Sequence, residues 1–378
     1  MPAIPLSLPY EWSGLWLRSA TKLRPRLFLF SLSFCKVTNN ISIFYQYGRK
    51  NDAEYSDVLI LSGFFHIFAT VMKYVNRINF LRRWSLGSVC LVTVTVVLFA
   101  GCASQRGCYV GVQGGGMVYY EERGKGEPLI LLHGHSLDRR MWDTQWRDFS
   151  ARYRTIRLDF RGYGLSSAMR EDLHTTHVDD VVALMDSLKI ERAHVVGLSM
   201  GAFVAGDMLA MYPDRLLSCV LCSGGIRNSK GPSEPMDSAE NAKREQEIAA
   251  LRLRGVEVMK REWTEQLVSG GGSRRETMRK PLRRMISQWT AWQPLHKEPR
   301  LFYGKEAWAE LRRKAPVSVP LLVLRGETEG KTSRARELDY VKDGEQITLP
   351  DCGHMMNMEQ PQRFNATVLS FLSKHSRQ

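Results

Sequence analysis

Short apolar runs alternate with amphipathic stretches along the chain from residue 109 onward. Apolar runs bounded by turn residues predict buried strands, and apolar positions that recur every three to four residues predict helices. This order predicts an α/β fold in which a mostly parallel sheet, led by an antiparallel hairpin, is flanked by helices. The expected strands are 110–112, 117–122, 129–132, 153–159, 193–196, 216–222, 321–324 and 346–349, and the expected helices are 139–149, 176–188, 200–211 and 361–373.

The alternation stops in the segment 226–314. This segment has no strong strand pattern and is rich in Arg, Lys and Glu, so it predicts a helical cap inserted into a core made of 109–225 and 315–378. Its Trp289 and Trp292 either line an apolar substrate pocket or hold the cap to the body, and the sequence favours neither. The segment has 20 Lys or Arg against 12 Asp or Glu. This excess would suit an anionic substrate or membrane surface, although such charges are more often simply solvated.

A different pattern occupies residues 72–102, upstream of this core. Met72 is followed by four basic residues and then by the uncharged run 84–101, which ends in small residues before Cys102. Such a succession is typical of a secretory signal. The Cys after Ala-Gly resembles the lipobox of bacterial lipoproteins, and this resemblance implies that Cys102 is lipidated and anchors the protein to a membrane of the bacterial cell envelope. The alternative is a single membrane-spanning anchor, for which the run is at the short end of the required length.

Residues 1–71 precede this signal, whereas a cleavable signal belongs at the start of a chain. They show no sustained periodicity and no motif, and Met72 is the only methionine between Met1 and Met117. We therefore expect translation to start at Met72 and residues 1–71 to be a non-native or disordered extension. The alternative is a genuine extension with membrane-associated segments such as 58–71.

Charge and cysteine content exclude two further classes of protein. The formal net charge is +14, but the basic residues are scattered and no zinc-ligand, helix-turn-helix or RNA-binding pattern accompanies them, so we expect no nucleic-acid partner. The seven cysteines show no disulfide spacing. Cys219 and Cys222 form a Cys-x-x-Cys pair in a predicted buried strand, without a second pair or a nearby His, which favours core packing over a redox or metal site.

One motif carries candidate chemistry. Gly197-Leu198-Ser199-Met200-Gly201 lies between the predicted strand 193–196 and the predicted helix 200–211. At such a junction a Gly-x-Ser-x-Gly run makes a sharp turn that lifts the serine hydroxyl clear of the sheet, and the glycines avoid crowding in that turn. We therefore predict that Ser199 is a nucleophile.

A serine hydroxyl needs a base, and the base needs an acid that orients it. His354 follows the last predicted strand in a loop at the carboxyl edge of the sheet, where ligands gather in α/β folds. It is therefore the expected base. The acid should follow the strand 321–324, where Glu327 and Glu329 are both candidates.

The oxyanion formed during attack needs backbone donors. One is the N–H of Met200, directly after the nucleophile. The other is expected in the loop 133–138, from the N–H of His135. His133 and His135 would otherwise be metal ligands, but no acidic or Cys partner lies near them in the sequence, so we expect no metal.

Together these motifs resemble the α/β-hydrolase superfamily. The shared features are His133-Gly134, the run DFRGYGLS at 159–166, the Ser199 motif and Gly353-His354. The arrangement His-Gly-x-x-x-Asp-x-x-x-Trp, which ends at Trp142, is most similar to the branch of enol-lactonases, esterases and haloperoxidase-like enzymes. The resemblance implies an α/β-hydrolase fold, catalysis without a cofactor, and Glu329 as the acid, at a place where the family usually has Asp.

The expected activity is hydrolysis of a small carboxylic ester or lactone through an acyl-enzyme on Ser199. A serine at this place argues against dehalogenase and epoxide-hydrolase chemistry, which in related families starts from a carboxylate. Carbon–carbon bond hydrolysis, perhydrolysis and acyl transfer to an alcohol stay open for the same triad of Ser199, Glu329 and His354. An alternative from a different class is a catalytically silent binding protein on the hydrolase fold.

Overall fold

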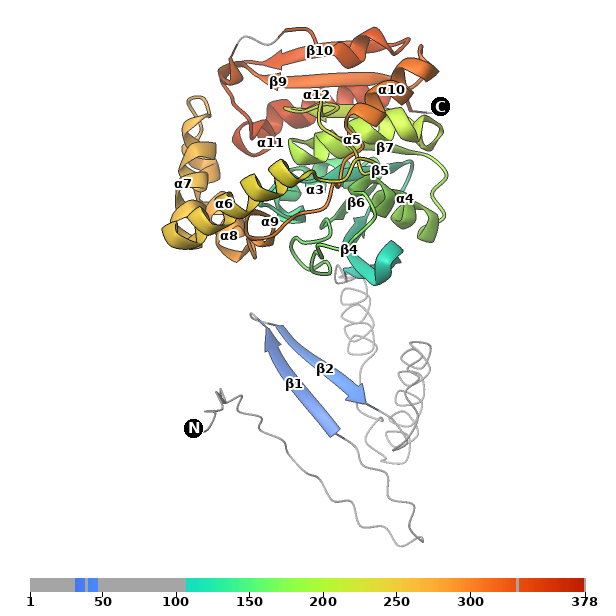
Figure 1. Ribbon diagram of the computed structural model, residues 1–378. Helices are drawn as coiled ribbons and strands as arrows, with labels where there is room; N and C mark the ends of the chain where they lie inside the picture. Colours follow the sequence, from blue (N-terminus) through green and yellow to red (C-terminus); the bar gives the residue numbers. More distant parts are fainter. Residues whose placement is uncertain (1–30, 38–39, 47–106, 331–332, 377–378) are drawn as a thin grey trace, which may run out of the picture. The chain divides into compact units, whose positions relative to one another are not determined.

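The computed structural model describes residues 31–37, 40–46, 107–330 and 333–376, and the chain divides into two units, Met1–Phe99 and Ala100–Gln378. In the first unit, β1 (Ser31–Val37) and β2 (Asn40–Gln46) pair antiparallel (Figure 1). The predicted signal 72–102, including Cys102, and most of the predicted extension 1–71 lie outside the described residues. Among the residues that are described, no helix is long and apolar enough to cross a membrane.

The second unit is built around one sheet of eight strands. The order across the sheet is β10-β9-β8-β7-β5-β6-β4-β3, in which β5 to β10 run parallel and the leading hairpin of β3 and β4 is antiparallel. The predicted fold class and all the predicted strands are confirmed. In chain order the strands are β3 (Cys108–Val112), β4 (Gly116–Arg123), β5 (Pro128–Leu132), β6 (Arg154–Leu158), β7 (Ala193–Leu198), β8 (Leu216–Cys222), β9 (Leu321–Gly326) and β10 (Gly344–Leu349).

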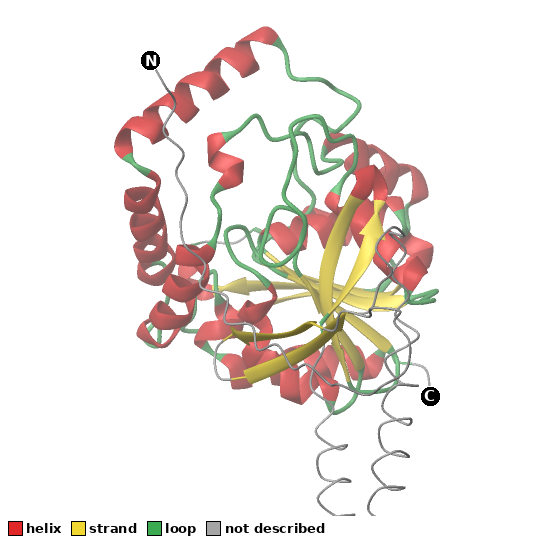
Figure 2. Ribbon diagram, turned by 90° about the horizontal axis from the view of Figure 1, so that it is seen from below, coloured by secondary structure: helices red, strands yellow, loops and turns green. Residues whose placement is uncertain are grey.

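Helices cover both faces of this sheet (Figure 2), and for this reason the central strands β7 and β8 are buried at every residue. One face packs against α4 (His177–Ser187), α5 (Met200–Met211) and α10 (Lys305–Lys314). The other packs against α3 (Asp143–Ser150) and α12 (Pro361–Lys374). Shorter helices complete the unit. They are the 3-10 helices Gln113–Gly115, Arg139–Trp142, Pro213–Arg215, Glu327–Glu329 and Arg336–Asp339, together with α11 (Met356–Glu359).

Four helices form the cap between β8 and α10. They are α6 (Ser238–Arg254), α7 (Val256–Ser269), α8 (Glu276–Gln288) and α9 (Trp292–Leu295). α6 begins at a capping box of Asp237 and Glu240 and ends at Gly255, whose φ of 92° suits glycine and turns the chain into α7. A glycine-rich loop that contains residues 270–273 joins α7 to α8. The last helix of the segment 226–314, α10, packs against α5 and belongs by its contacts to the body.

Candidate active site

Ser199 lies at the junction of β7 and α5. Its φ of 56° and ψ of −114° fall in a region that costs a non-glycine residue about 1–3 kcal/mol, a kind of strain that concentrates at active sites. The neighbouring glycines have no room for a side chain. A Cβ at Gly197 would lie 2.1 Å from the carbonyl oxygen of Gly201, and a Cβ at Gly201 would lie 2.1 Å from that of Leu132. The segment therefore forms the sharp turn that the motif predicts.

Glu329 and His354 lie together in the loops after β9 and β10. His354 Nδ1 is 2.8 Å from Glu329 Oε1. The other carboxylate oxygen of Glu329 accepts from the Gly326 N–H at 2.9 Å and from the Ser223 hydroxyl at 2.7 Å. Burial alone would raise the pKa of Glu329, but the hydrogen bonds from His354, Gly326 and Ser223 outweigh it, and the pKa is lowered. Glu329 is thus a carboxylate at neutral pH.

Backbone hydrogen bonds bring Ser199 to the same edge of the sheet. The Ser199 N–H donates to the Cys222 carbonyl at 2.9 Å, and the N–H of Ser223 donates to the Leu324 carbonyl at 2.9 Å. Through its hydroxyl, Ser223 then reaches the predicted acid. No hydrogen bond joins the Ser199 hydroxyl to His354 in the described part of the chain, a common situation before a substrate binds, when catalytic hydrogen bonds are often long.

The loop after β5 lies against the predicted nucleophile, Ser199. A Cβ at Gly134 would be 3.5 Å from the Ser199 Cβ. His133 fixes this loop, because its Nδ1 bonds to the Gly134 carbonyl at 2.8 Å and its Nε2 accepts from the Phe160 N–H at 3.0 Å. Burial lowers the pKa of His133, so the ring is neutral. Both ring nitrogens are therefore engaged, and no group of three or more His, Cys, Asp or Glu that could hold a metal occurs among the described residues.

The two predicted oxyanion donors lie at this loop and at the Ser199 turn. His135 is in the loop, and Met200 directly follows Ser199. Within the described residues, the backbone N–H groups of His135 and Met200 make no hydrogen bond to protein. Ser136 follows His135 with a φ of 62°, and its hydroxyl donates to the His135 carbonyl at 2.5 Å. Trp263 of α7 in turn donates from Nε1 to Ser136 Oγ at 2.7 Å. The cap thus supports the loop through Trp263, a residue that the sequence did not single out for this role.

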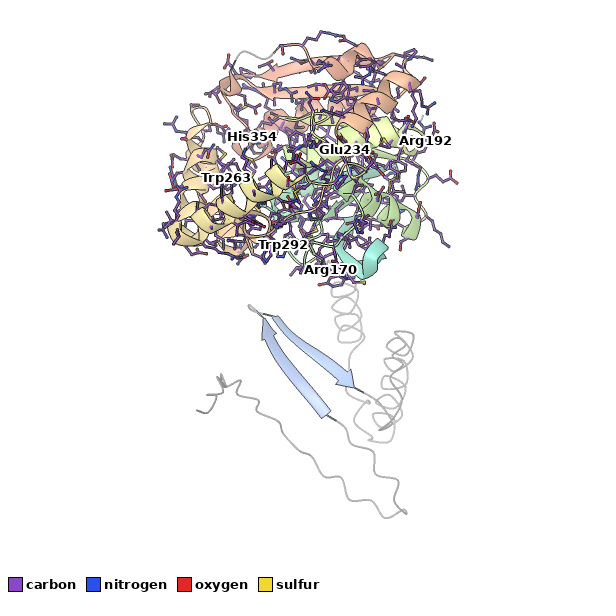
Figure 3. The ribbon with its side chains drawn as sticks, viewed as in Figure 1. Arg170, Arg192, Glu234, Trp263, Trp292 and His354 are labelled. Atoms are coloured by element: carbon purple, nitrogen blue, oxygen red, sulfur yellow. The ribbon has the colours of Figure 1, made fainter. Side chains whose placement is uncertain are left out.

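The two predicted pocket tryptophans occupy different places. Trp289 is buried, and its ring lies edge-on to the His135 ring with centroids 5.0 Å apart. Trp292 stacks on His296 at 4.5 Å and packs against the small buried cluster that includes Met169 and Leu173 of the body. Trp292 and Trp263 both lie on the cap (Figure 3). Trp289 is thus next to the loop 133–138, the predicted oxyanion loop, whereas the contacts of Trp292 hold the cap to the body.

The glycine-rich loop of the cap contacts the loops that carry the predicted acid and the predicted base. The Thr328 hydroxyl donates to the Gly270 carbonyl at 2.6 Å, and the Ser273 N–H donates to Asp351 Oδ1 at 2.7 Å. Thr328 directly precedes the predicted acid Glu329, and Asp351 lies three residues before the predicted base His354. These contacts join positions far apart in the sequence, so no local pattern could have predicted them.

The chain belongs to the alpha/beta hydrolase family, whose model matches residues 129–367, and the predicted family resemblance is thus confirmed. A 2-hydroxy-6-oxononadienedioate/2-hydroxy-6-oxononatrienedioate hydrolase from Paraburkholderia phymatum is 30% identical, covering 70% of this chain and 95% of that protein. The enol-lactonase structure from Burkholderia xenovorans LB400 is 26% identical with a TM-score of 0.52, covering 70% of this chain and 100% of that one. A thermophilic esterase from Thermogutta terrifontis shares the fold, with 24% identity and a TM-score of 0.57 over 72% of this chain and 100% of that one.

Proposed function

We propose that this protein is a serine hydrolase that cleaves a small carboxylic ester or a lactone through an acyl-enzyme on Ser199. The observation that carries the proposal is the arrangement at one edge of the sheet. The strained Ser199 turn lies there beside a His354–Glu329 pair joined at 2.8 Å. The acid and the base thus follow β9 and β10, in the chain order of serine, acid and histidine that is typical of this fold. The likeness to an esterase and an enol-lactonase supports the same reaction class.

The reaction follows from these positions. His354 takes the hydroxyl proton as Ser199 Oγ attacks the carbonyl carbon, and Glu329 stabilises the imidazolium that forms. The N–H groups of His135 and Met200 hold the oxyanion. Collapse of this intermediate breaks the bond to the leaving oxygen, which receives the proton from His354. A water molecule, deprotonated by the same ring, then attacks the acyl carbon. The bond from this carbon to Ser199 Oγ breaks, and His354 returns its proton to Oγ, so that the acid and the free Ser199 hydroxyl are released.

Covalent labelling and kinetics test this function. A fluorophosphonate probe should label the wild-type protein and fail to label Ser199→Ala. On a panel of p-nitrophenyl esters and lactones, Ser199→Ala should lose at least about 10⁴-fold in kcat. Labelling that survives in Ser199→Ala, or a wild-type protein that is neither labelled nor active on the panel, would contradict the proposal and favour a catalytically silent binding protein.

A second candidate is hydrolysis of a carbon–carbon bond by the same triad. The likeness to the 2-hydroxy-6-oxononadienedioate hydrolase, at 30% identity, favours it. Adding that dioate to the panel distinguishes the two reactions. If kcat/KM for the dioate is higher than for every ester and lactone, the protein is a carbon–carbon bond hydrolase and the ester or lactone is not its substrate. Perhydrolysis and acyl transfer are tested on the same panel by adding hydrogen peroxide or a short alcohol as the acceptor.

A further inference from the structure

An open cavity of about 350 Å³ lies between the cap and the loop that carries the predicted oxyanion donor His135. Its walls come from that loop, from the chain entering α6, from α6 and α9, and from the segment that follows α9. The volume is in the lower range for small-molecule sites, so the cavity fits one end of a small substrate. The lining residues are His135, Met236, Arg244, Gln293, Pro294 and Glu298.

Most polar groups on these walls are already engaged. Arg244 donates to the backbone carbonyls of Gln293 and His296. The Gln293 side chain accepts from Trp289 Nε1 at 2.9 Å and donates to the Gly162 carbonyl at 3.2 Å. These bonds hold the cap together and to the body, and they leave little capacity for a ligand.

Glu298 is the exception. Glu298 lines the cavity, and its carboxyl group has no hydrogen-bond or ion-pair partner among the described residues. Burial raises the pKa of Glu298 to about 7, against the effect of Arg244 and Arg227, which favour the ionised form. A carboxyl group that is partly withdrawn from water and has no partner is stabilised by any ligand that donates a hydrogen bond to it.

The second open group belongs to the oxyanion loop itself. His135 Nδ1 lies 2.8 Å from the Tyr163 hydroxyl, which leaves Nε2 without a partner in the described residues. Burial lowers the pKa of His135 to about 4, so the ring is neutral at pH 7 and Nε2 either donates or accepts one hydrogen bond. The cavity therefore offers one carboxyl group and one neutral imidazole to a ligand.

The charges around Glu298 select among possible donors. Arg244 lies on the cavity wall, and Arg227, whose guanidinium is 5.2 Å from the centre of the Phe203 ring, also acts on Glu298. Phe203 is in the first turn of α5, the helix that begins directly after Ser199. Two cations near one carboxylate repel an ammonium group. A neutral hydroxyl or amide N–H meets no such repulsion.

We propose that this cavity is a specificity subsite in which Glu298 accepts a hydrogen bond from a hydroxyl or amide N–H at the end of the substrate remote from the scissile carbonyl. The proposal rests on the proposed function, because the N–H of His135 that holds the carbonyl oxygen belongs to the same residue as the cavity wall. The substrate class is thus an ester or lactone with a neutral polar end, in preference to one that is purely alkyl.

Matched esters test this subsite. One series varies the acyl chain and the other the alcohol, each as pairs of equal length that end in a hydroxyl or a methyl group. We expect the hydroxylated member to have the higher kcat/KM by about 10- to 100-fold in one series, the range for a hydrogen bond to a charged group. The preference should disappear in Glu298→Leu and be intermediate in Glu298→Gln. Glu245→Leu, which removes an exposed cap carboxylate paired with Lys297, is the matched control and should keep it.

The outcomes separate the subsite from the proposed function. Equal kcat/KM within every pair, or a preference that persists in Glu298→Leu, overturns the subsite and leaves the hydrolase intact. If no ester is turned over, the subsite is decided by ligand-observed NMR on Ser199→Ala protein, with methyl 6-hydroxyhexanoate and methyl hexanoate as probes, because only the first has a hydrogen-bond donor. We expect only the hydroxylated ester to bind, and its binding to be lost when Glu298→Leu is added. Equal signals from the two probes overturn the subsite. Should the Leu variant fail to fold, the same comparisons are made with Glu298→Gln.

Discussion

Two glutamates in one 3-10 helix, Glu327 and Glu329, have different partners. Glu329 bonds to His354, whereas Glu327 accepts from the Asp351 N–H at 2.8 Å. Residue types alone leave both open as the acid, because both follow the same strand, and only the family resemblance selects Glu329. The Ser199 turn differs in this respect. Adjacent residues determine a strand–helix turn, so it could be predicted from the sequence motif alone.

Replacing Glu329 by Gln should remove the charge that stabilises the protonated His354 ring and should favour its wrong tautomer. We expect kcat on an ester to fall by about 10³–10⁴-fold, as when the carboxylate is lost from comparable triads. Steady-state kinetics measure the loss, and circular dichroism checks the fold. Glu327→Gln is the matched control and should retain most of the activity. Equal losses in the two variants would mean that Glu329 is not the acid.

At the scale of secondary-structure elements, α7 of the cap supports one side of the site and leads into a loop that supports the other. Trp263 in α7 bonds to Ser136 in the loop 133–138, and Gly270, directly after α7, accepts from Thr328 beside the predicted acid. Amphipathic spacing predicts that such helices have a buried face. It does not predict which loop that face meets, and for this reason the strands and helices could be predicted from the sequence while the cap contacts could not.

Trp263→Phe should keep the ring and remove the N–H that supports the Ser136 turn. Because one hydrogen bond next to the oxyanion donor is lost, we expect about a tenfold fall in kcat with little change in KM. Trp308→Phe is a suitable control, since the Trp308 Nε1 is buried without a hydrogen-bond partner. A rise in KM at constant kcat would instead assign Trp263 to substrate binding.

The contact between α5 and the segment before α10 contains a buried acid. Asp207 is 1% exposed, and its Oδ2 accepts from the Tyr303 N–H at 2.8 Å while Oδ1 has no partner. Burial raises the pKa of Asp207 to about 7. Below pH about 4 the group is protonated in both the folded and the unfolded chain. Between pH about 4 and pH about 7, Asp207 is ionised in the unfolded chain but still protonated in the folded chain, so the free energy of unfolding falls as the pH rises.

Asp207→Asn should therefore unfold like the wild type near pH 4 and be more stable at pH 8, by up to about 4 kcal/mol for a shift of this size. Urea denaturation at the two pH values measures the difference. The exposed Asp186, which pairs with Arg215, gives the control variant Asp186→Asn, whose stability should show no such change with pH. A loss of stability in Asp207→Asn that is equal at both pH values would contradict this account.

At the scale of the whole molecule, the sequence predicts a tether that lies outside the described residues. The pattern of basic residues, an apolar run and Ala-Gly before Cys102 supports our proposal of a lipid-anchored protein of the bacterial cell envelope. In a Gram-negative host fed with labelled palmitate, the wild type should carry label and sediment with membranes, and Cys102→Ser should do neither. Cys108→Ser is the control. Mass spectrometry of native protein that recovers peptides from residues 1–71 would contradict the predicted start at Met72.

The bonds from Trp263 to Ser136 and from Ser273 to Asp351 also bear on how the cap can be exchanged. A grafted cap with no indole at the place of Trp263 would leave the Ser136 hydroxyl without that donor, and one whose loop after α7 follows another path would leave Asp351 without its backbone donor. Such a graft would disturb the predicted catalytic loops of a body that had not itself been changed. Recombination between family members should therefore yield an active protein only when Ser136 and Asp351 are transferred together with α7 and the loop after it. Directed evolution of substrate range should keep α7 and vary the walls formed by α6, α9 and Glu298.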